Sequence, residues 1–331
     1  MNASPSPLRF LGAPWFAPVM GLCGLSLAWH RATPVMGETA GGIAVAIALL
    51  AAAAFLALVS GWLVRAHRFP EAAREDFAHP VRHPFVAAVP VSVILLATAA
   101  VALDGPSAFA RVLWAIGSAA QLVTTAWVVG RWWRANRPDG LAWPSVTPIL
   151  FIPVVGNVLV PLAGVPLGHA DWSAAQFAVG AFFWPVVQAL VYARLAVHGP
   201  WPDRLQPAVF IFIAPPAVIG LALAAFGAPP AFAWGAWGLA LFALATAATQ
   251  ARAIAALPFA IPHWALSFPL AAFAALTLRL AAPGSAFAML GIVLLAIASL
   301  VVAVLLVATA KGLRDGSLLA PEPVAALKPA A

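Results

Sequence analysis

The residues best suited to a functional role lie in one apolar stretch, 261–281, which reads IPHWALSFPLAAFAALTLRLA. An apolar helix of about 20 residues crosses roughly 30 Å of bilayer hydrocarbon. Pro269 interrupts this stretch near its middle, because proline lacks a backbone donor and displaces the carbonyl one turn back. A carbonyl freed in this way must face protein or water, since lipid cannot pair with it. Phe268, a bulky ring beside that break, is therefore a candidate plug of a water-filled path.

Composition indicates the class of protein that contains this stretch. Of the 331 residues, 64% are apolar and only 8% are charged, and the mean hydropathy is +0.99. A soluble fold of this size could not cover so much apolar surface, so the chain is predicted to be a multi-spanning membrane protein. The net charge is +7, but the basic residues are scattered through short loops, which is typical of membrane orientation and not of nucleic-acid binding.

Hydropathy and turn signals predict ten membrane spans in one transmembrane domain, residues 12–310. This domain follows a cytoplasmic N-terminus, 1–11, and precedes a flexible cytoplasmic tail, 311–331. Of the 17 basic residues, 14 fall on the N-terminal side of the membrane, so both termini are predicted to be cytoplasmic. A short amphipathic helix is expected at 71–77. The predicted spans are roughly 12–30, 42–64, 85–103, 110–133, 146–165, 172–193, 207–226, 231–251, 261–281 and 285–309.

Prolines alternate along these spans. They interrupt spans one, three, five, seven and nine, whereas among the even spans only the sixth contains one, Pro185. The repeat corresponds to one helical hairpin and makes all five kinked helices parallel, which an inverted repeat would not do. We therefore predict an all-α fold of five hairpins, with the kinked odd helices inside lining a pore and the even helices outside. The prolines at the predicted kinks are Pro18, Pro90, Pro153, Pro215, Pro216 and Pro269.

The content of the inner spans limits what could pass between them. They contain no Asp, Glu or Lys, and Arg279 lies close to a span end, which argues against a cation channel or a carboxylate-driven antiporter. Helix N-termini at the proline breaks and basic loops at the inner mouth favour an anion. A carrier of neutral solutes would also fit uncharged walls. The polar side chains that could line such a path are Ser26, Ser92, Asn157 and Ser267.

The cysteine and the histidines give little support for a metal site, a haem site or a catalytic site. Cys23 is the only cysteine, which excludes an intrachain disulfide and a cysteine-based metal cage. Histidines at loops and span ends do not supply the facing pairs that a haem needs, so we expect no cofactor, no metal and no catalysis. A membrane-embedded enzyme is therefore the least favoured class. Tryptophans near span ends are expected to form an interfacial belt, and these include Trp29, Trp62, Trp132, Trp133, Trp172 and Trp264.

Four sequence blocks resemble a known family. They are GLCGLSLAW at 21–29, HPVRHPF at 79–85, the segment 207–216 ending in Ala-Pro-Pro, and WALSFP at 264–269, which is the most specific. Together they resemble the tellurite-resistance/dicarboxylate transporter family, in the branch of bacterial TehA-type proteins and plant guard-cell slow-type anion channels. The chain lacks the long cytoplasmic extensions of the plant members, so regulation by phosphorylation is not inferred.

The resemblance implies five hairpins in a quasi-five-fold array, a homotrimer with one pore per subunit, and a pore occluded by the phenylalanine that matches Phe268. It also implies conduction of small inorganic anions such as chloride and nitrate. We therefore expect a channel for monovalent anions whose partners are these ions and membrane lipid. The alternative is a carrier or exporter of a small oxyanion or C4-dicarboxylate on the same fold. The spans contain no mid-membrane basic side chain to pair with a dicarboxylate, which favours monovalent anions.

Overall fold

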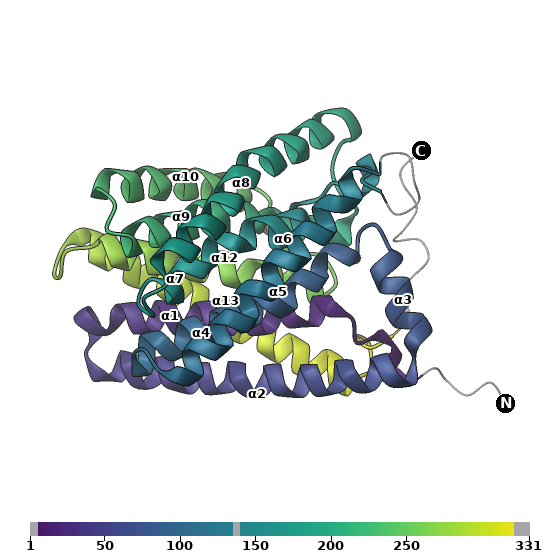
Figure 1. The fold of residues 1–331 in the computed structure, drawn as a ribbon, viewed down its shortest axis with the longest axis horizontal. Helices are drawn as coiled ribbons and strands as arrows, with labels where there is room; N and C mark the ends of the chain where they lie inside the picture. Colours follow the sequence, from purple (N-terminus) through teal and green to yellow (C-terminus); the bar gives the residue numbers. More distant parts are fainter. Residues whose placement is uncertain (1–5, 135–139, 321–331) are drawn as a thin grey trace.

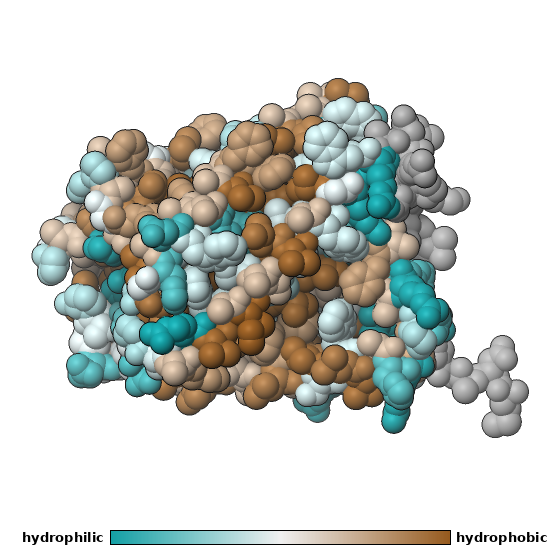
Figure 2. Space-filling model, in the orientation of Figure 1, coloured by the Kyte–Doolittle hydropathy of each residue, from teal (hydrophilic) through white to brown (hydrophobic). Residues whose placement is uncertain are grey.

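The computed structural model describes residues 6–134 and 140–320, and within these ranges the chain forms helices and turns without a β-strand. Eight helices are long and apolar enough to cross a membrane. Two further apolar helical segments, α1 (Ala17–Met36) and Pro148–Gly164, lie where the first and fifth spans are predicted. Hydrophobic residues cover the middle of the face in Figure 2, and hydrophilic residues gather towards its two ends. This distribution fits a multi-pass membrane protein, as predicted.

The even-numbered spans form long, uninterrupted α-helices. Ser107 and Ser285 begin two of them as N-caps, each accepting a backbone N–H bond of 3.1 Å from the residue three positions further on. Gly199, with φ of 68°, ends the third of them in the left-handed conformation that glycine adopts without strain. These outer helices are α2 (Glu38–Arg68), α5 (Ala108–Trp132), α8 (Ala170–His198), α10 (Pro230–Ala248) and α13 (Ala286–Arg314).

Each odd-numbered span is divided into a 3-10 helix and an α-helix. The predicted prolines occupy the second or third position of the α-helical part, where a backbone N–H needs no intrahelical partner. The expected mid-span kink is therefore a change of helix type. The inner segments are η2–α1 (Ala13–Phe16, Ala17–Met36), η3–α4 (His83–Ala87, Ala88–Asp104), η5–α6–η6–α7 (Pro148–Leu150, Phe151–Val155, Gly156–Leu159, Val160–Gly164), η7–α9 (Asp203–Ile213, Ala214–Ala225) and η8–α12 (Ile261–Leu266, Ser267–Leu280).

The inner segments form a closed ring inside the outer helices. Going round it, α1 contacts α4, α4 contacts α7, α7 contacts α9, α9 contacts α12, and α12 returns to α1. Each inner segment also packs on the outer helix that follows it in the chain (Figure 1). Between 67% and 83% of the apolar window is buried in the three inner spans of full length, against 11–33% in the outer helices. The predicted all-α fold, with odd helices inside and even helices outside, is confirmed.

Short elements cover the end of the molecule where the described chain begins. The helix α3 (Pro70–Ala78) lies across this end (Figure 1), at the position of the predicted amphipathic helix. Of the predicted tail, residues 311–314 complete α13, and Leu318 and Leu319 pack near Trp15 and Ile261. Residues 321–331 lie outside the described part. The remaining short helices are η1 (Pro7–Phe10), η4 (Trp143–Ser145) and α11 (Ala251–Ala255).

Candidate transport path

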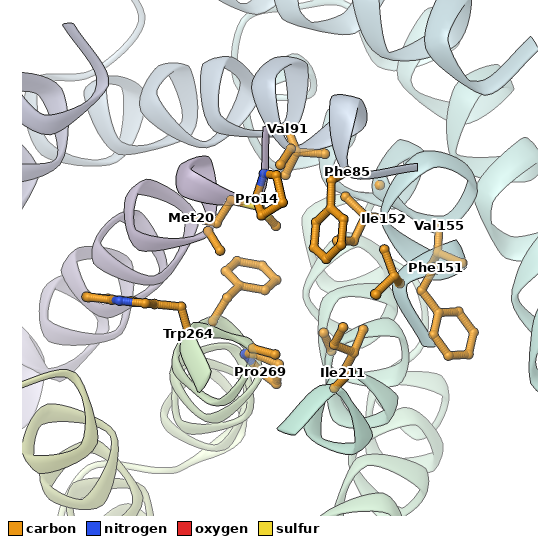
Figure 3. A pocket seen from close by; sticks show the side chains of 18 of the residues that line it. Pro14, Met20, Phe85, Val91, Phe151, Ile152, Val155, Ile211, Trp264 and Pro269 are labelled. Atoms are coloured by element: carbon orange, nitrogen blue, oxygen red, sulfur yellow. The ribbon is translucent and has the colours of Figure 1, made fainter. Parts of the chain in front are cut away.

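A cavity of about 90 Å³ lies at the centre of the inner ring, and all five inner segments contribute to its wall (Figure 3). Its lining side chains are apolar. In Figure 3, Phe85 and Ile211 reach the open centre from two different segments, whereas the Trp264 ring extends away from it. The lining includes Pro14, Met20, Phe85, Val91, Ile152, Gly156, Ile211, Pro215, Trp264, Phe268 and Pro269. The ring therefore encloses a narrow hydrophobic space on its own axis.

Phe268 is the second residue of α12 and lines this central cavity. Its ring lies against α1 at Gly24, where an added Cβ would come within 2.8 Å of Phe268 Cδ2. One turn earlier, a Cβ on Gly21 would overlap the hydroxyl of Ser267. The two glycines, three residues apart on one face of α1, thus leave the space that the Ser267–Phe268 pair occupies. This contact explains the block at 21–29 in physical terms.

The segment that carries Phe268 is fixed to the outer ring through Trp264. The Trp264 side chain is only 1% exposed, and its Nε1 donates a bond of 2.9 Å to Thr309 Oγ1 on α13. Ser267 Oγ donates a bond of 2.6 Å to the Trp264 carbonyl, at the junction of η8 and α12. A carbonyl beside the proline break is thereby paired inside the protein. Phe268 consequently projects from a junction that is held on both sides.

The four polar side chains expected along the path bond elsewhere. Ser26 Oγ donates to Ala44 O on α2 at 2.8 Å, and Ser92 Oγ donates to Ala88 O in its own helix at 2.7 Å. All four, with Asn157 and Ser267, are buried, and the wall of the central cavity contains none of them. Of the predicted kink prolines, Pro215 and Pro269 line the cavity, whereas Pro18, Pro90, Pro153 and Pro216 are buried behind its wall. The wall of the central cavity is thus more apolar than the sequence predicts.

A buried polar cluster that sequence reasoning did not identify surrounds the most fragmented inner segment. Thr125 Oγ1 of α5 bonds to the Pro153 carbonyl at 2.6 Å, and Gln121 Nε2 donates to the same carbonyl at 2.9 Å. Asn157 donates to Thr125 Oγ1 at 2.8 Å and accepts from Gln176 Nε2 of α8 at 2.8 Å. Outer-helix side chains therefore bond to backbone carbonyls just before the change from α6 to η6. The signal available in the sequence was the pair of amides, one in each neighbouring apolar span.

A second, larger cavity of about 450 Å³ lies at the end of the molecule where α3 is located, and we call it the vestibule. It adjoins the central cavity, because Pro14, Phe85, Leu205, Ile261 and Pro262 line both. These five residues form a collar between the two spaces. Unlike the central cavity, the vestibule has charged side chains in its wall, namely Arg9, Arg65, Glu75, Asp76, Arg82 and Arg204, together with His79.

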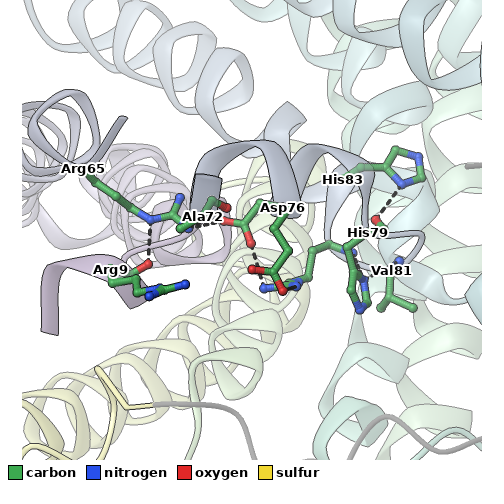
Figure 4. A network of polar contacts seen from close by, with 9 residues as sticks. Arg9, Arg65, Ala72, Asp76, His79, Val81 and His83 are labelled. Atoms are coloured by element: carbon green, nitrogen blue, oxygen red, sulfur yellow. Dashed lines mark hydrogen bonds and ion pairs between the residues drawn. The ribbon is translucent and has the colours of Figure 1, made fainter. Parts of the chain in front are cut away.

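Asp76 organises the charged wall of the vestibule. One of its carboxylate oxygens accepts from Arg65 at 2.7 Å and the other pairs with Arg82 at 2.8 Å. Arg65 is nearly buried and also donates to Arg9 O at 2.8 Å (Figure 4). Glu75 makes a longer contact with Arg82, 3.5 Å. The network ties α2, α3 and the N-terminal segment together around the mouth of the path.

A closed ring of five helical hairpins, with a narrow apolar space on its axis and a charged vestibule at one end, defines a multi-pass membrane transport protein. The particular family follows from comparison with known proteins. The family model described as SLAC1, voltage-dependent anion channel, matches residues 11–310, and the chain belongs to this family. The predicted family resemblance is therefore confirmed.

Relatives of this chain come from plants, archaea and bacteria. S-type anion channel SLAH2 of Arabidopsis thaliana is 28% identical over 227 residues, 68% of this chain and 43% of the plant protein. An uncharacterized transporter of Methanocaldococcus jannaschii is 25% identical over 293 residues, 79% of this chain and 81% of the archaeal protein. The tellurite resistance protein TehA homolog of Haemophilus influenzae is 22% identical over 212 residues, 64% of this chain and 61% of that protein. The match spans less than half of the plant channel.

Proposed function

We propose that this protein is a channel for small monovalent anions, such as chloride and nitrate, and that Phe268 occludes its path. The observation that carries the proposal is the position of Phe268 in the wall of the apolar cavity at the centre of the ring. Membership of the anion-channel family and the similarity to S-type anion channels support the choice of anions. The family contains proteins that are called transporters as well as channels, so the rate of transport is part of the test.

The apolar wall supports a preference for monovalent ions. Moving an ion from water into a low-dielectric space costs a Born energy that rises with the square of its charge, so a divalent anion pays about four times as much as a monovalent one of similar size. Weakly hydrated monovalent anions lose the least on entering such a space. Uncharged walls also bind an ion weakly, which lets it leave again quickly. The structure thus favours fast passage of single charges.

We further propose that the protein is a homotrimer in a bacterial inner membrane, with both termini in the cytoplasm. Leu49, Phe182 and Leu300 on the outer helices are 66–67% exposed. Such exposed apolar side chains support a surface that contacts lipid or a neighbouring subunit. The excess of basic residues on the terminal side supports the orientation. Cross-linking of purified protein in detergent and protease access to a C-terminal tag in right-side-out vesicles test the two statements. A monomeric cross-linking pattern contradicts the trimer, and cleavage of the tag from outside contradicts the orientation.

The decisive experiment compares wild type with Phe268→Ala in proteoliposomes at matched protein density. Removing the ring opens the constriction, so we expect chloride flux to rise by about tenfold, equivalent to about 1.4 kcal/mol of the barrier. Phe242→Ala on α10 is the matched control, because Phe242 is 65% exposed on the outer ring and its removal leaves the path intact. Unchanged flux in folded Phe268→Ala would contradict the occlusion. Saturable uptake of a dicarboxylate or sulfite without anion current would replace the channel with a carrier.

A further inference from the structure

The vestibule and the central cavity differ in size and in charge although they share a collar. The vestibule encloses about 450 Å³ and the central cavity about 90 Å³. Among the described residues, four arginines and two carboxylates line the vestibule, which leaves an excess of two positive charges before any charge on His79 is counted. Charged and polar walls hold water, whereas the central cavity has an apolar lining. An ion arriving from the vestibule therefore passes from a hydrated basic space into a dry one.

The two carboxylates do not use all the hydrogen-bond donors around them. Asp76 is shared by Arg65 and Arg82, and Arg65 is further occupied by the carbonyls of Arg9 and Ala72, at 2.8 and 3.2 Å. By contrast, Arg82 Nε is buried and has no hydrogen-bond partner among the described residues. The backbone carbonyl of Arg9 is engaged, while its side chain lies at the exposed edge of the vestibule. The unused donor capacity and the excess positive charge coincide near Arg9 and Arg82.

These properties select for an anion that carries two charges. Two excess positive charges attract a divalent anion about twice as strongly as a monovalent one at the same distance. The same anion is rejected at the collar, because its Born cost in the apolar cavity is about four times that of a monovalent ion. The divalent anion is therefore retained in the vestibule, whereas a monovalent anion passes on into the central cavity. Its position beside the collar places it in the way of other ions.

We propose that the vestibule is a binding site for a divalent oxyanion, which is held next to Arg9 and Arg82 and blocks the passage of monovalent anions into the central cavity. The blocking step rests on the proposed channel function, whereas the binding step does not. Planar guanidinium groups suit oxyanions because they present paired N–H donors in a fixed geometry. The bound anion accepts hydrogen bonds from guanidinium donors that Asp76 and Glu75 do not use.

Binding is tested on the purified full-length protein by isothermal titration with sodium sulfate, with sodium nitrate at equal ionic strength as the monovalent comparison. We expect saturable sulfate binding and no saturable nitrate binding. Arg9→Gln removes one positive charge and should weaken sulfate binding about tenfold, the effect of one lost charged contact. The backbone carbonyl that receives the Arg65 bond stays in place in this variant.

Glu75→Gln provides a change in the opposite direction. It removes a negative charge whose side chain is 64% exposed and whose contact with Arg82 is long, 3.5 Å, so the fold should tolerate it. Sulfate should bind severalfold more tightly to this variant, a gain that a damaged fold cannot produce. Arg111→Gln is the matched control, because Arg111 is an exposed arginine in the first turn of α5, at the other end of the molecule. Its sulfate affinity should equal that of wild type.

Chloride flux in proteoliposomes tests the block. Sulfate on the vestibule side should inhibit the wild-type flux at the concentrations at which it binds, with a weaker effect in Arg9→Gln and a stronger one in Glu75→Gln. Absent sulfate binding, or equal affinity in wild type, Arg9→Gln and Glu75→Gln, would overturn the site. Binding with the expected order of variants, but no chloride flux in any of them, would support the site and refute the proposed channel. Chloride flux without sulfate binding would support the proposed channel and refute the sulfate site.

Discussion

The inner and outer rings are built from similarly apolar sequences, but their helices differ in continuity. Each outer helix runs for 19 to 31 residues as unbroken α-helix, whereas each inner segment changes helix type at a proline. The difference follows from the surroundings, because lipid cannot pair a backbone group released by such a break, while packed neighbours can. Among the described residues, the changes of helix type lie in the inner ring, and the outer α8 stays α-helical even across Pro185. The comparison predicts that the same kind of substitution has different effects in the two rings.

A proline placed in the outer ring should have the largest effect. Leu300, in α13, is 67% exposed, so a carbonyl released by Leu300→Pro would have no protein partner on that side. We expect a loss of about 3 kcal/mol or more in the free energy of unfolding. The reverse change inside, Pro216→Ala, removes no hydrogen bond and should cost at most about 1 kcal/mol. Thermal unfolding in detergent measures both. Equal losses of stability in the two variants would contradict the proposed difference between the inner and outer rings.

The bond from the outer helix α5 to the Pro153 carbonyl gives the next largest effect. Thr125→Val removes a hydroxyl that bonds to the Pro153 carbonyl at 2.6 Å and accepts from Asn157, so it should destabilise the protein by about 1–3 kcal/mol. Thr124→Val is the matched control on the same helix, since Thr124 bonds to Ala120 O in its own turn and is partly exposed. We expect the control to change stability by less than about 0.5 kcal/mol. A similar loss in both variants would show that the break is stabilised in another way.

Glycine substitutions should give the smallest effects, with opposite signs in the two rings. Gly21→Ala on the inner α1 would overlap Ser267 and should cost about 1–2 kcal/mol. Gly238→Ala on the outer α10 meets no neighbouring atom within 4 Å and should stabilise the helix by about 0.5–1 kcal/mol. Chemical unfolding of the two variants checks the signs. Stabilisation by both would contradict the close approach of α1 to α12.

The sequence predicted the ring but not the wall of its cavity. Proline spacing identified the inner helices because a break is costly in lipid, and this argument needs no knowledge of partners. The polar residues were harder to place. Asn157 lies in an inner segment, yet its amide turns towards Gln176 on an outer helix, and a one-dimensional pattern does not show in which direction a side chain of a broken helix points.

Tryptophans show the same difficulty. Trp133 is 85% exposed, as an interfacial residue should be, but Trp264 is 1% exposed and bonds to Thr309. Both residues lie near predicted span ends, so position along the chain does not separate them. The vestibule was also beyond prediction, because it depends on α3 and the N-terminal segment meeting at the mouth of the path. Its network joins residues 9 and 65, which are far apart in sequence.

The 3-10 helix η8, which precedes Phe268, has a mechanical consequence. A 3-10 helix rises about 2.0 Å and turns about 120° per residue, against about 1.5 Å and 100° for an α-helix. Conversion of the six residues of η8 to α-helix would shorten the segment by about 3 Å and rotate its end by about 120°. Such a conversion would turn the Phe268 ring about the helix axis, because Phe268 follows η8 directly at the start of α12. Distances between labels on η8 and α13 that change with anion flux would reveal this movement, and constant distances would exclude it.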